Sequence, residues 1–266
     1  MDVRDKLWLW GHPAGSHNGR HGVQGESRIT PVEAACYLGI PNLIVVNYGN
    51  SGPFPPFDQF ALPMRSLKRV VWSIVGAAGQ TDAALREEVF KLAARMPNIT
   101  GLMMDDFFHD PEDEEKGPLG ALSRAELQAV RERLRLPERT LDLWVVLYQH
   151  MLDLPVEEYL DLCDKVTFWT WKAEALRDLG SNFDRLEKLA PRQGKLLGCY
   201  MWDYGARQPM PLHLMKQQCE FALDLLRQRW IEGIIFLASC ICDLGLDTVE
   251  WARGWISEVG GTVLPA

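Results

Sequence analysis

Two adjacent carboxylates, Asp105 and Asp106, directly follow the short apolar run at residues 101–104. Helical patterns lie on both sides of this run, which predicts that it is a buried parallel strand. Because a strand interior has no place for two charges, we expect the pair at the end of the strand, where the chain meets water or substrate. Side chains alternate along a strand, but at a fraying end both carboxylates can turn toward one pocket.

Two carboxylates held close together cannot both ionise freely, so the pKa of one of them should rise. A carboxylic acid that stays protonated beside an ionised partner is the arrangement that general acid and base catalysis uses near neutral pH. The alternative interpretation is structural, with the pair of Asp105 and Asp106 capping a helix or ordering a loop.

Eight apolar runs recur along the chain with helical patterns between them, and each run is expected to be a strand. The runs lie at residues 7–10, 42–47, 69–75, 101–104, 142–148, 165–171, 195–202 and 233–238. Helices are expected at 31–38, 57–62, 81–95, 123–134, 155–162, 182–189, 211–228 and 246–259. Two of them open on capping-box patterns, at Thr30 with Glu33 and at Ser123 with Glu126.

This alternation predicts an α/β fold, a single (β/α)8 TIM barrel that forms one catalytic domain over residues 1–266. An open doubly wound sheet usually has fewer strands, and a nucleotide-binding one carries a glycine-rich turn after its first strand. Gly11 and Gly15 do not form that motif.

Active sites of such barrels form at the carboxyl ends of the strands, and here those ends carry polar and aromatic residues. Carboxylates and amides bind hydroxyl groups, and indole rings cover the apolar faces of sugar rings, so this rim favours a polyhydroxylated neutral ligand. Trp169 and Trp171 share one face of their run, which lines the pocket if it points inward and packs under helices if it points outward. The expected substrate-binding residues are His12, Asn47, Tyr148, Gln149, Trp169, Trp171, Trp202, Asp203 and Tyr204.

Glycoside hydrolysis needs one carboxylic acid to protonate the leaving oxygen and a second group that acts as base, nucleophile or stabiliser. Asp105 and Asp106 are therefore the expected catalytic residues of a glycosidase. A non-catalytic carbohydrate-binding barrel is an alternative, and so is a metal-dependent barrel hydrolase. The sugar and the oligomeric state stay open.

The segment Met103–Phe107 resembles the paired-aspartate motif on the fourth strand of the O-GlcNAcase-type β-N-acetylglucosaminidases, and the segment Tyr200–Tyr204 resembles their seventh-strand motif. The resemblance implies a substrate 2-acetamido group as internal nucleophile, Asp105 as the residue that polarises it, and Asp106 as the general acid and base. That family places an Asn and a further Asp after its seventh-strand Trp, whereas this chain has Asp203 and no second Asp there.

No metal and no cofactor are expected. His12, His17 and His21 are spaced by five and four residues rather than as the His-x-His of metal-dependent barrels, and are expected to be solvated or bonded to substrate. Cys240-x-Cys242 is a weak metal signal on its own. Lys172 stands where a Schiff-base lysine could lie, but the lack of a phosphate-binding glycine motif after the seventh or eighth strand disfavours that role. The acidic run at 110–115 is expected to be a solvated lid rather than a cation site.

The 266-residue chain is 47% hydrophobic and 24% charged, which is typical of a soluble globular protein. Its net charge of −8 disfavours nucleic acids and anionic membranes as partners, leaving a small-molecule or oligosaccharide substrate. Its ten tryptophans suit a site that stacks on flat ligands. The six cysteines lie mostly in apolar runs and are expected to be reduced, which together with the lack of a signal-peptide pattern favours a cytoplasmic location. The alternative is a secreted protein whose signal peptide has been removed.

Overall fold

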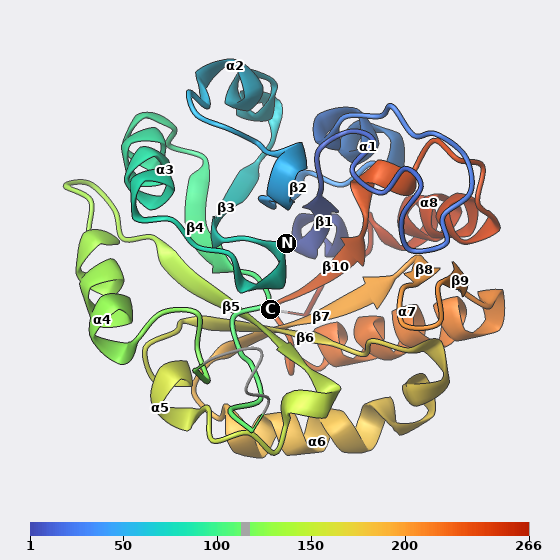
Figure 1. Cartoon of the computed structure of the whole chain (residues 1–266). Coiled ribbons are helices and arrows are strands. Elements are labelled where there is room, and N and C mark those ends of the chain that lie inside the picture. Colours follow the sequence, from blue (N-terminus) through green and yellow to red (C-terminus); the bar gives the residue numbers. More distant parts are fainter. Residues whose placement is uncertain (113–117, 266) are drawn as a thin grey trace.

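Eight parallel strands close into a barrel in the order β1-β10-β7-β6-β5-β4-β3-β2, as the computed structural model of residues 1–112 and 118–265 shows (Figure 1). The barrel strands are β1 (Leu7–Gly11), β2 (Asn42–Val45), β3 (Arg69–Val75), β4 (Ile99–Met104), β5 (Asp142–Tyr148), β6 (Lys165–Trp169), β7 (Gly194–Tyr200) and β10 (Gly233–Leu237). The predicted (β/α)8 TIM barrel is confirmed.

The helices form an outer ring around these strands (Figure 1). The α-helices are α1 (Pro31–Leu38), α2 (Asp58–Ala61), α3 (Ala83–Arg95), α4 (Arg124–Arg133), α5 (Glu157–Leu160), α6 (Leu179–Leu189), α7 (Leu212–Arg227) and α8 (Asp247–Val259). Short 3-10 helices are η1 (Val3–Lys6), η2 (Gly49–Ser51), η3 (Leu62–Ser66), η4 (Ala77–Gly79), η5 (Gln149–Met151), η6 (Ala173–Asp178) and η7 (Ser239–Ile241). Among the described residues, no helix is both long and apolar enough to cross a membrane.

Both capping boxes form as the sequence predicted. The Thr30 side chain accepts a hydrogen bond from the Glu33 backbone N–H, while the Glu33 carboxylate accepts one from the Thr30 backbone N–H at 2.8 Å. Ser123 and Glu126 make the same reciprocal pair at the start of α4. These local bonds satisfy N–H groups that a helix leaves unpaired in its first turn, so the sequence alone could place both helix starts.

Four strands end earlier than their apolar patterns suggested. The second ends at Val45 instead of residue 47, and the eighth ends at Leu237 instead of residue 238. The sixth ends at Trp169 instead of residue 171, and the seventh ends at Tyr200 instead of residue 202. Residues Trp202–Asp203 form β8, which pairs with β9 (Gln208–Pro209) as a small antiparallel hairpin. The apolar pattern continues past these strands because most of the residues that follow are themselves buried. The acidic run predicted at 110–115 reaches into residues 113–117, which lie outside the described residues.

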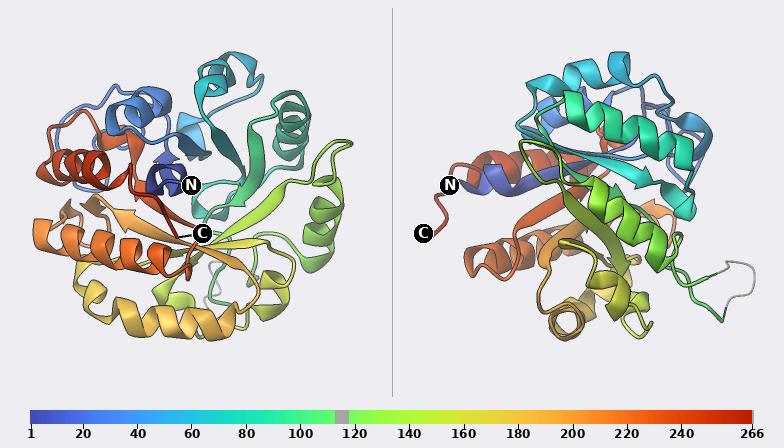
Figure 2. Two further views of the ribbon diagram at one scale, coloured as in Figure 1. Left: turned by 180° about the vertical axis from the view of Figure 1, so that it is seen from behind. Right: turned by 90° about the vertical axis from the view of Figure 1, so that its left-hand side faces the viewer.

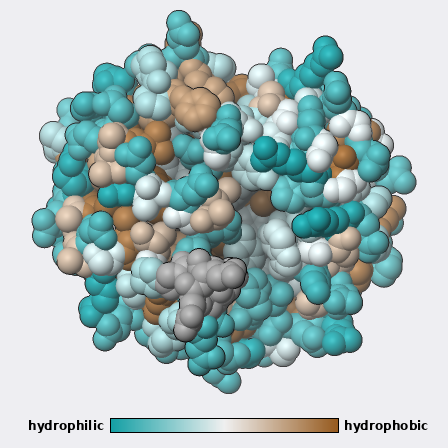
Figure 3. Space-filling model, viewed as in Figure 1, coloured by the Kyte–Doolittle hydropathy of each residue, from teal (hydrophilic) through white to brown (hydrophobic). Residues whose placement is uncertain are grey.

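The amino and carboxyl termini lie together at one end of the barrel (Figure 2), where Asp2 and Val263 form an antiparallel bridge. The strands begin at this end, so their carboxyl ends open on the opposite face. That face is hollowed near its centre (Figure 3).

Tryptophan rings and glycines together fill the barrel interior. Trp8 on β1 and Trp144 on β5 meet edge to face with centroids 4.9 Å apart, and Trp10 meets Trp169 at 5.2 Å. A Cβ atom on Gly198 of β7 would lie 2.0 Å from Cε3 of Trp169. The glycine therefore leaves the space that this indole occupies.

Replacing Gly198 with alanine should destabilise the protein strongly. The Trp169 ring is held by Trp10 and by Tyr200, whose centroid lies 5.1 Å away, so it cannot yield to the new methyl group. We expect the free energy of unfolding to fall by about 3 kcal/mol or more, measured by urea denaturation. Gly254→Ala in α8 is the matched control, because a Cβ there meets nothing within 4 Å and should stabilise by about 0.5–1 kcal/mol. Equal stability of the two variants would contradict this account.

Candidate active site

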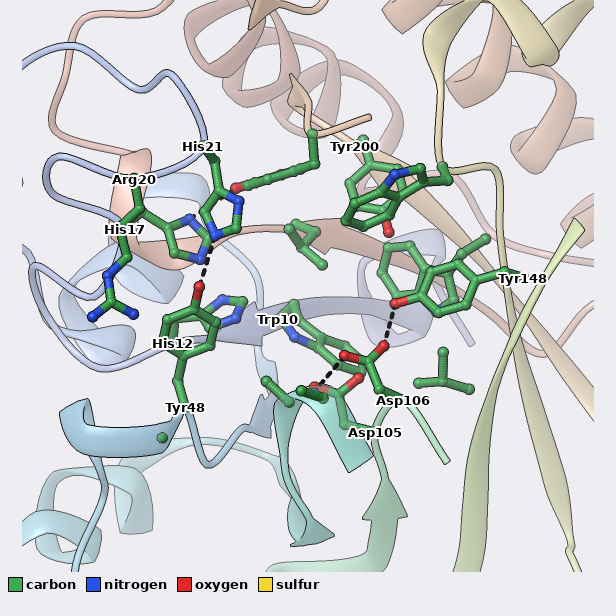
Figure 4. Close-up of a pocket in the computed structure, with 18 of the residues that line it drawn as sticks. Trp10, His12, His17, Arg20, His21, Tyr48, Asp105, Asp106, Tyr148 and Tyr200 are labelled. Atoms are coloured by element: carbon green, nitrogen blue, oxygen red, sulfur yellow. Dashed lines mark hydrogen bonds between the residues drawn. The ribbon is translucent and has the colours of Figure 1, made fainter. Parts of the chain in front are cut away.

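The paired carboxylates stand at the carboxyl end of β4, as the sequence indicated. The Asp105 backbone N–H still donates to the Val75 carbonyl of β3 at 2.9 Å, so the strand pairing continues to this residue. Asp106 then takes a left-handed backbone conformation, with φ of 43°, which asparagine and aspartate tolerate better than most side chains. This turn ends the strand alternation, and both carboxylates line one pocket (Figure 4).

Asp105 is the buried member of the pair, with 5% of its surface exposed. Burial raises the pKa of Asp105 well above its usual range, and the negative charge of Asp106 raises it further. Both causes oppose ionisation, so Asp105 holds a proton at pH values where an ordinary aspartate has lost it.

Asp106 is half-buried and accepts two hydrogen bonds. Its Oδ2 accepts from the Ala78 backbone N–H and its Oδ1 from the Tyr148 hydroxyl, each at 2.7 Å. Burial raises the pKa of Tyr148 well above its usual range, so this hydroxyl stays protonated and donates a hydrogen bond to Asp106. Ala78 also has a positive φ, of 59°. Two non-glycine residues in the left-handed region thus meet across one hydrogen bond, and strain of this kind is concentrated at functional sites.

Aromatic side chains form the floor and one wall of the pocket, which has a volume of about 340 Å³. This lies within the ~300–1,000 Å³ of small-molecule sites. Trp10 and Trp169 lie on β1 and β6, Tyr200 ends β7, and Trp171 follows β6. Both tryptophans that follow Phe168 therefore face inward, which settles the orientation that the sequence left open.

A second hollow of about 680 Å³ adjoins the first. Four residues line both: Ala78, Asp106, Tyr148 and Trp171. The Asp106 carboxylate therefore stands where the two hollows meet.

Histidines from the loop after β1 form the wall opposite the carboxylates (Figure 4). His12 and His17 are only 5% and 2% exposed, so neither is solvated. Burial lowers the pKa of His12 to about 3 and that of His17 further still, which leaves both rings neutral. His21 Nε2 lies 2.7 Å from the Tyr48 hydroxyl, and the Arg20 guanidinium stands over the Tyr48 ring at 5.8 Å.

Seven of the predicted site residues line this pocket, and the other four make hydrogen bonds with neighbouring backbone. The lining residues are His12, Asp105, Asp106, Tyr148, Trp169, Trp171 and Tyr204.

The remaining four hold neighbouring backbone in place. The Asn47 carbonyl accepts from the Ala77 N–H at 3.0 Å, and Gln149 Oε1 accepts from the Trp171 N–H at 2.9 Å. Trp202 Nε1 donates to the His21 carbonyl at 3.0 Å.

The fourth residue, Asp203, accepts a hydrogen bond through Oδ1 from the Ala206 N–H at 3.0 Å within the β8–β9 turn. Lys172 is exposed and lies outside both hollows as the described residues define them.

Sequence reasoning missed several lining residues, including Trp10, Arg20, Ala78 and Tyr200. Trp10 had a signal, because it shares the inward face of its strand with Trp8. Ala78 contributes only its backbone N–H. Almost every residue type carries this group, so the sequence gives no signal for it.

Comparisons with known proteins identify the fold. No protein-family model matches the chain, and no curated protein matches its sequence. Among solved structures, the spore cortex-lytic enzyme SleL of Bacillus megaterium is similar, with a TM-score of 0.58 and 14% identity over 98% of this chain and 75% of that one. Active domain 2 of a Pyrococcus furiosus chitinase has a TM-score of 0.57 and 13% identity over 97% of each chain.

Another similar structure is the tryptophan synthase alpha-subunit of Pyrococcus furiosus, with a TM-score of 0.52 and 11% identity over 98% of this chain and all of that one. Its name denotes a different activity from the other two. Similarity at these identities defines a TIM-barrel protein by fold, and the function has to be argued from the site.

Proposed function

We propose that this protein is a glycoside hydrolase in which Asp106 is the general acid and base and Asp105 is the stabilising group. The observation that carries the proposal is the unequal environment of two adjacent carboxylates in one aromatic pocket. Asp105 is buried and its pKa is raised, and Asp106 accepts two hydrogen bonds where two hollows meet. Pairs of titratable groups whose surroundings separate them in this way take distinct acid and base roles.

The position of each carboxylate supports its role. A glycosidic bond that joins a sugar in the inner hollow to a leaving group in the outer one would lie beside Asp106, which lines both. Asp105 lines only the inner hollow, beneath the sugar. Trp10, Trp169 and Trp171 offer flat apolar surface for the ring faces of that sugar.

In the proposed mechanism, substrate binding moves a proton from Asp105 to Asp106. A donor group on the sugar that binds Asp105 favours the charged form of Asp105, and repulsion between the two carboxylates then moves the proton to Asp106. Asp106 gives this proton to the leaving oxygen as the bond from that oxygen to the sugar breaks. It later takes a proton from the water that adds to the sugar carbon.

For a 2-acetamido sugar, the group at Asp105 would be the amide N–H, as the resemblance to the β-N-acetylglucosaminidases implies. The acetamido oxygen then bonds to the sugar carbon as the leaving group departs. An Asp105 carboxyl group whose pKa is raised by burial suits this task, because it becomes charged only when a hydrogen-bond donor is present.

A panel of aryl glycosides with and without 2-acetamido groups tests the proposal. Cleavage of 2-acetamido substrates alone would support the substrate-assisted route, while cleavage of plain glycosides would keep the hydrolase and discard that route. Absence of turnover combined with calorimetric binding of oligosaccharides would instead indicate a carbohydrate-binding barrel.

Tyr148→Phe should lower kcat/KM by about 10–100-fold, because a hydrogen bond to a charged group contributes about 1.5–3 kcal/mol. The variant removes only the oxygen that lies 2.7 Å from Asp106. Steady-state kinetics on the best aryl glycoside measure the effect. Tyr37→Phe on exposed α1 is the control and should match the wild-type protein. An unchanged kcat/KM for Tyr148→Phe would show that the hydrogen bond from Tyr148 to Asp106 does not contribute to catalysis.

A further inference from the structure

We propose that His12, His17 and Cys240 form a binding site for a transition-metal ion, best suited to Zn²⁺. Closure of the barrel brings these residues together from opposite ends of the chain. His12 directly follows β1, Cys240 lies in η7 after β10, and these two strands are hydrogen-bonded neighbours. One nitrogen of each histidine and the Cys240 sulfur all lie within 4.8 Å of one another.

The three side chains are buried, and one of them lacks a partner. Among the described residues, the buried Nδ1 of His12 finds no hydrogen-bond partner. Such an atom costs about 1–3 kcal/mol, and ligation of a metal would satisfy it. Ser239 Oγ donates to the His12 carbonyl at 3.0 Å, which fixes the backbone that carries this ring.

His17 is oriented for the same purpose. Its Nδ1 lies 3.1 Å from the Tyr204 hydroxyl, which leaves Nε2 as the ring nitrogen for a metal. Metal-binding histidines almost always carry such a bond on their other nitrogen, because it sets the tautomer and the ring orientation. Tyr204 is therefore a positioning residue for the site.

The donor set selects the class of ion. Two imidazoles and one thiolate suit Zn²⁺ and related transition metals, whereas Ca²⁺ and Mg²⁺ require oxygen ligands. Tetrahedral Zn²⁺ holds its donors roughly 3.5 Å apart, so small side-chain rotations must draw the three atoms together. Binding displaces the Cys240 thiol proton to solvent.

His12 and His17 also line the pocket, so the fourth coordination position faces the ligand space. Three protein ligands with one open position are typical of zinc sites that receive water or substrate. The site lies on the wall opposite Asp105 and Asp106 (Figure 4), and the inference goes beyond the glycosidase proposal and does not depend on it.

Titration of the metal-free full-length protein with Co²⁺ tests the site, because Co²⁺ replaces Zn²⁺ and reports thiolate ligation by a charge-transfer absorption band. We expect one Co²⁺ per chain with this band, and displacement by one equivalent of Zn²⁺. Cys240→Ser should lose the band and weaken binding by about 100-fold or more. Cys242→Ser is the matched control, since Cys242 is buried on the same turn but is outside the cluster, and it should titrate like the wild-type protein.

Two results would overturn the site. One is the absence of Co²⁺ and Zn²⁺ binding by the wild-type protein, and the other is a thiolate band that survives Cys240→Ser. Circular dichroism checks that Cys240→Ser is folded. If it is not, His12→Asn takes its place in the same titration, and binding as tight as that of the wild-type protein would equally refute the site. The readout is binding, so it stands whether or not the glycoside panel succeeds.

Discussion

Asp106→Asn should lower kcat by about 10²–10⁴-fold while leaving the fold intact. Removing a general acid and base costs this much in rate, and asparagine can neither give the proton to the leaving oxygen nor take it from water. The side chain keeps its size, and asparagine tolerates the left-handed backbone at this position, where φ is 43°. One of the two donors, Ala78 N–H or the Tyr148 hydroxyl, loses its acceptor, which costs about 1–2 kcal/mol of stability.

The comparison needs a variant that removes one negative charge elsewhere in the barrel. Asp142→Asn does so at the start of β5, at the opposite end of the strands, where Asp142 pairs with Lys165 at 3.3 Å. We expect full activity from Asp142→Asn and near-zero activity from Asp106→Asn, with similar circular dichroism spectra. Turnover by Asp106→Asn at the wild-type rate would refute the acid and base role.

Asp105→Asn should abolish most of the activity and at the same time stabilise the protein. The activity is lost because asparagine cannot become the charged group that accepts a donor from the sugar, at an expected cost of about 10²–10³-fold in kcat. The variant is expected to be more stable because burial and the neighbouring Asp106 charge both disfavour the charged form of Asp105. These two causes raise its pKa above the ordinary value of 3.8. A protein that is more stable without a side chain keeps that side chain for function.

The stabilisation expected from Asp105→Asn depends on pH. The unfolded chain releases the Asp105 proton near the ordinary pKa, whereas the folded protein keeps it to higher pH. The native state therefore binds more protons than the unfolded state over this window, and the free energy of unfolding falls as pH rises through it. Asparagine cannot ionise and removes that loss of stability, so the variant should be more stable than the wild-type protein at neutral pH.

Urea denaturation at several pH values measures this difference. The gap between Asp105→Asn and the wild-type protein should widen as pH rises from the ordinary pKa of 3.8 toward neutrality. A variant less stable than the wild-type protein across this range would contradict a raised pKa for Asp105 in the folded state.

The amino-acid sequence by itself determined the barrel and the place of its acidic pair. Alternating apolar runs and helical patterns record which segments are buried, and the boxes at Thr30 and Ser123 fix helix starts through bonds between residues three apart. The Asp105–Asp106 pair was placed for the same reason, since two charges cannot continue a buried strand. Each of these features depends on residues that lie close together along the chain, so the sequence pattern is enough to predict it.

Only the tertiary structure decided which rim residues reach the pocket. Asp203 and Trp202 follow β7 closely but turn into a hairpin, and their polar atoms bond to backbone instead of facing the pocket. The left-handed turn at Asp106 and the exposed N–H of Ala78 depend on how the loops after β3 and β4 pack together.

Tertiary structure alone also joins His12 and His17 to Cys240. In the sequence, Cys240 stands only beside Cys242, and the histidines lack the spacing of a metal motif. Barrel closure places β1 against β10, which unites the two ends of the chain. The barrel predicted from the sequence already implied that the first and last strands pair, but a pattern read along the chain does not show that the side chains after those strands turn toward one another, because their directions depend on how the loops pack.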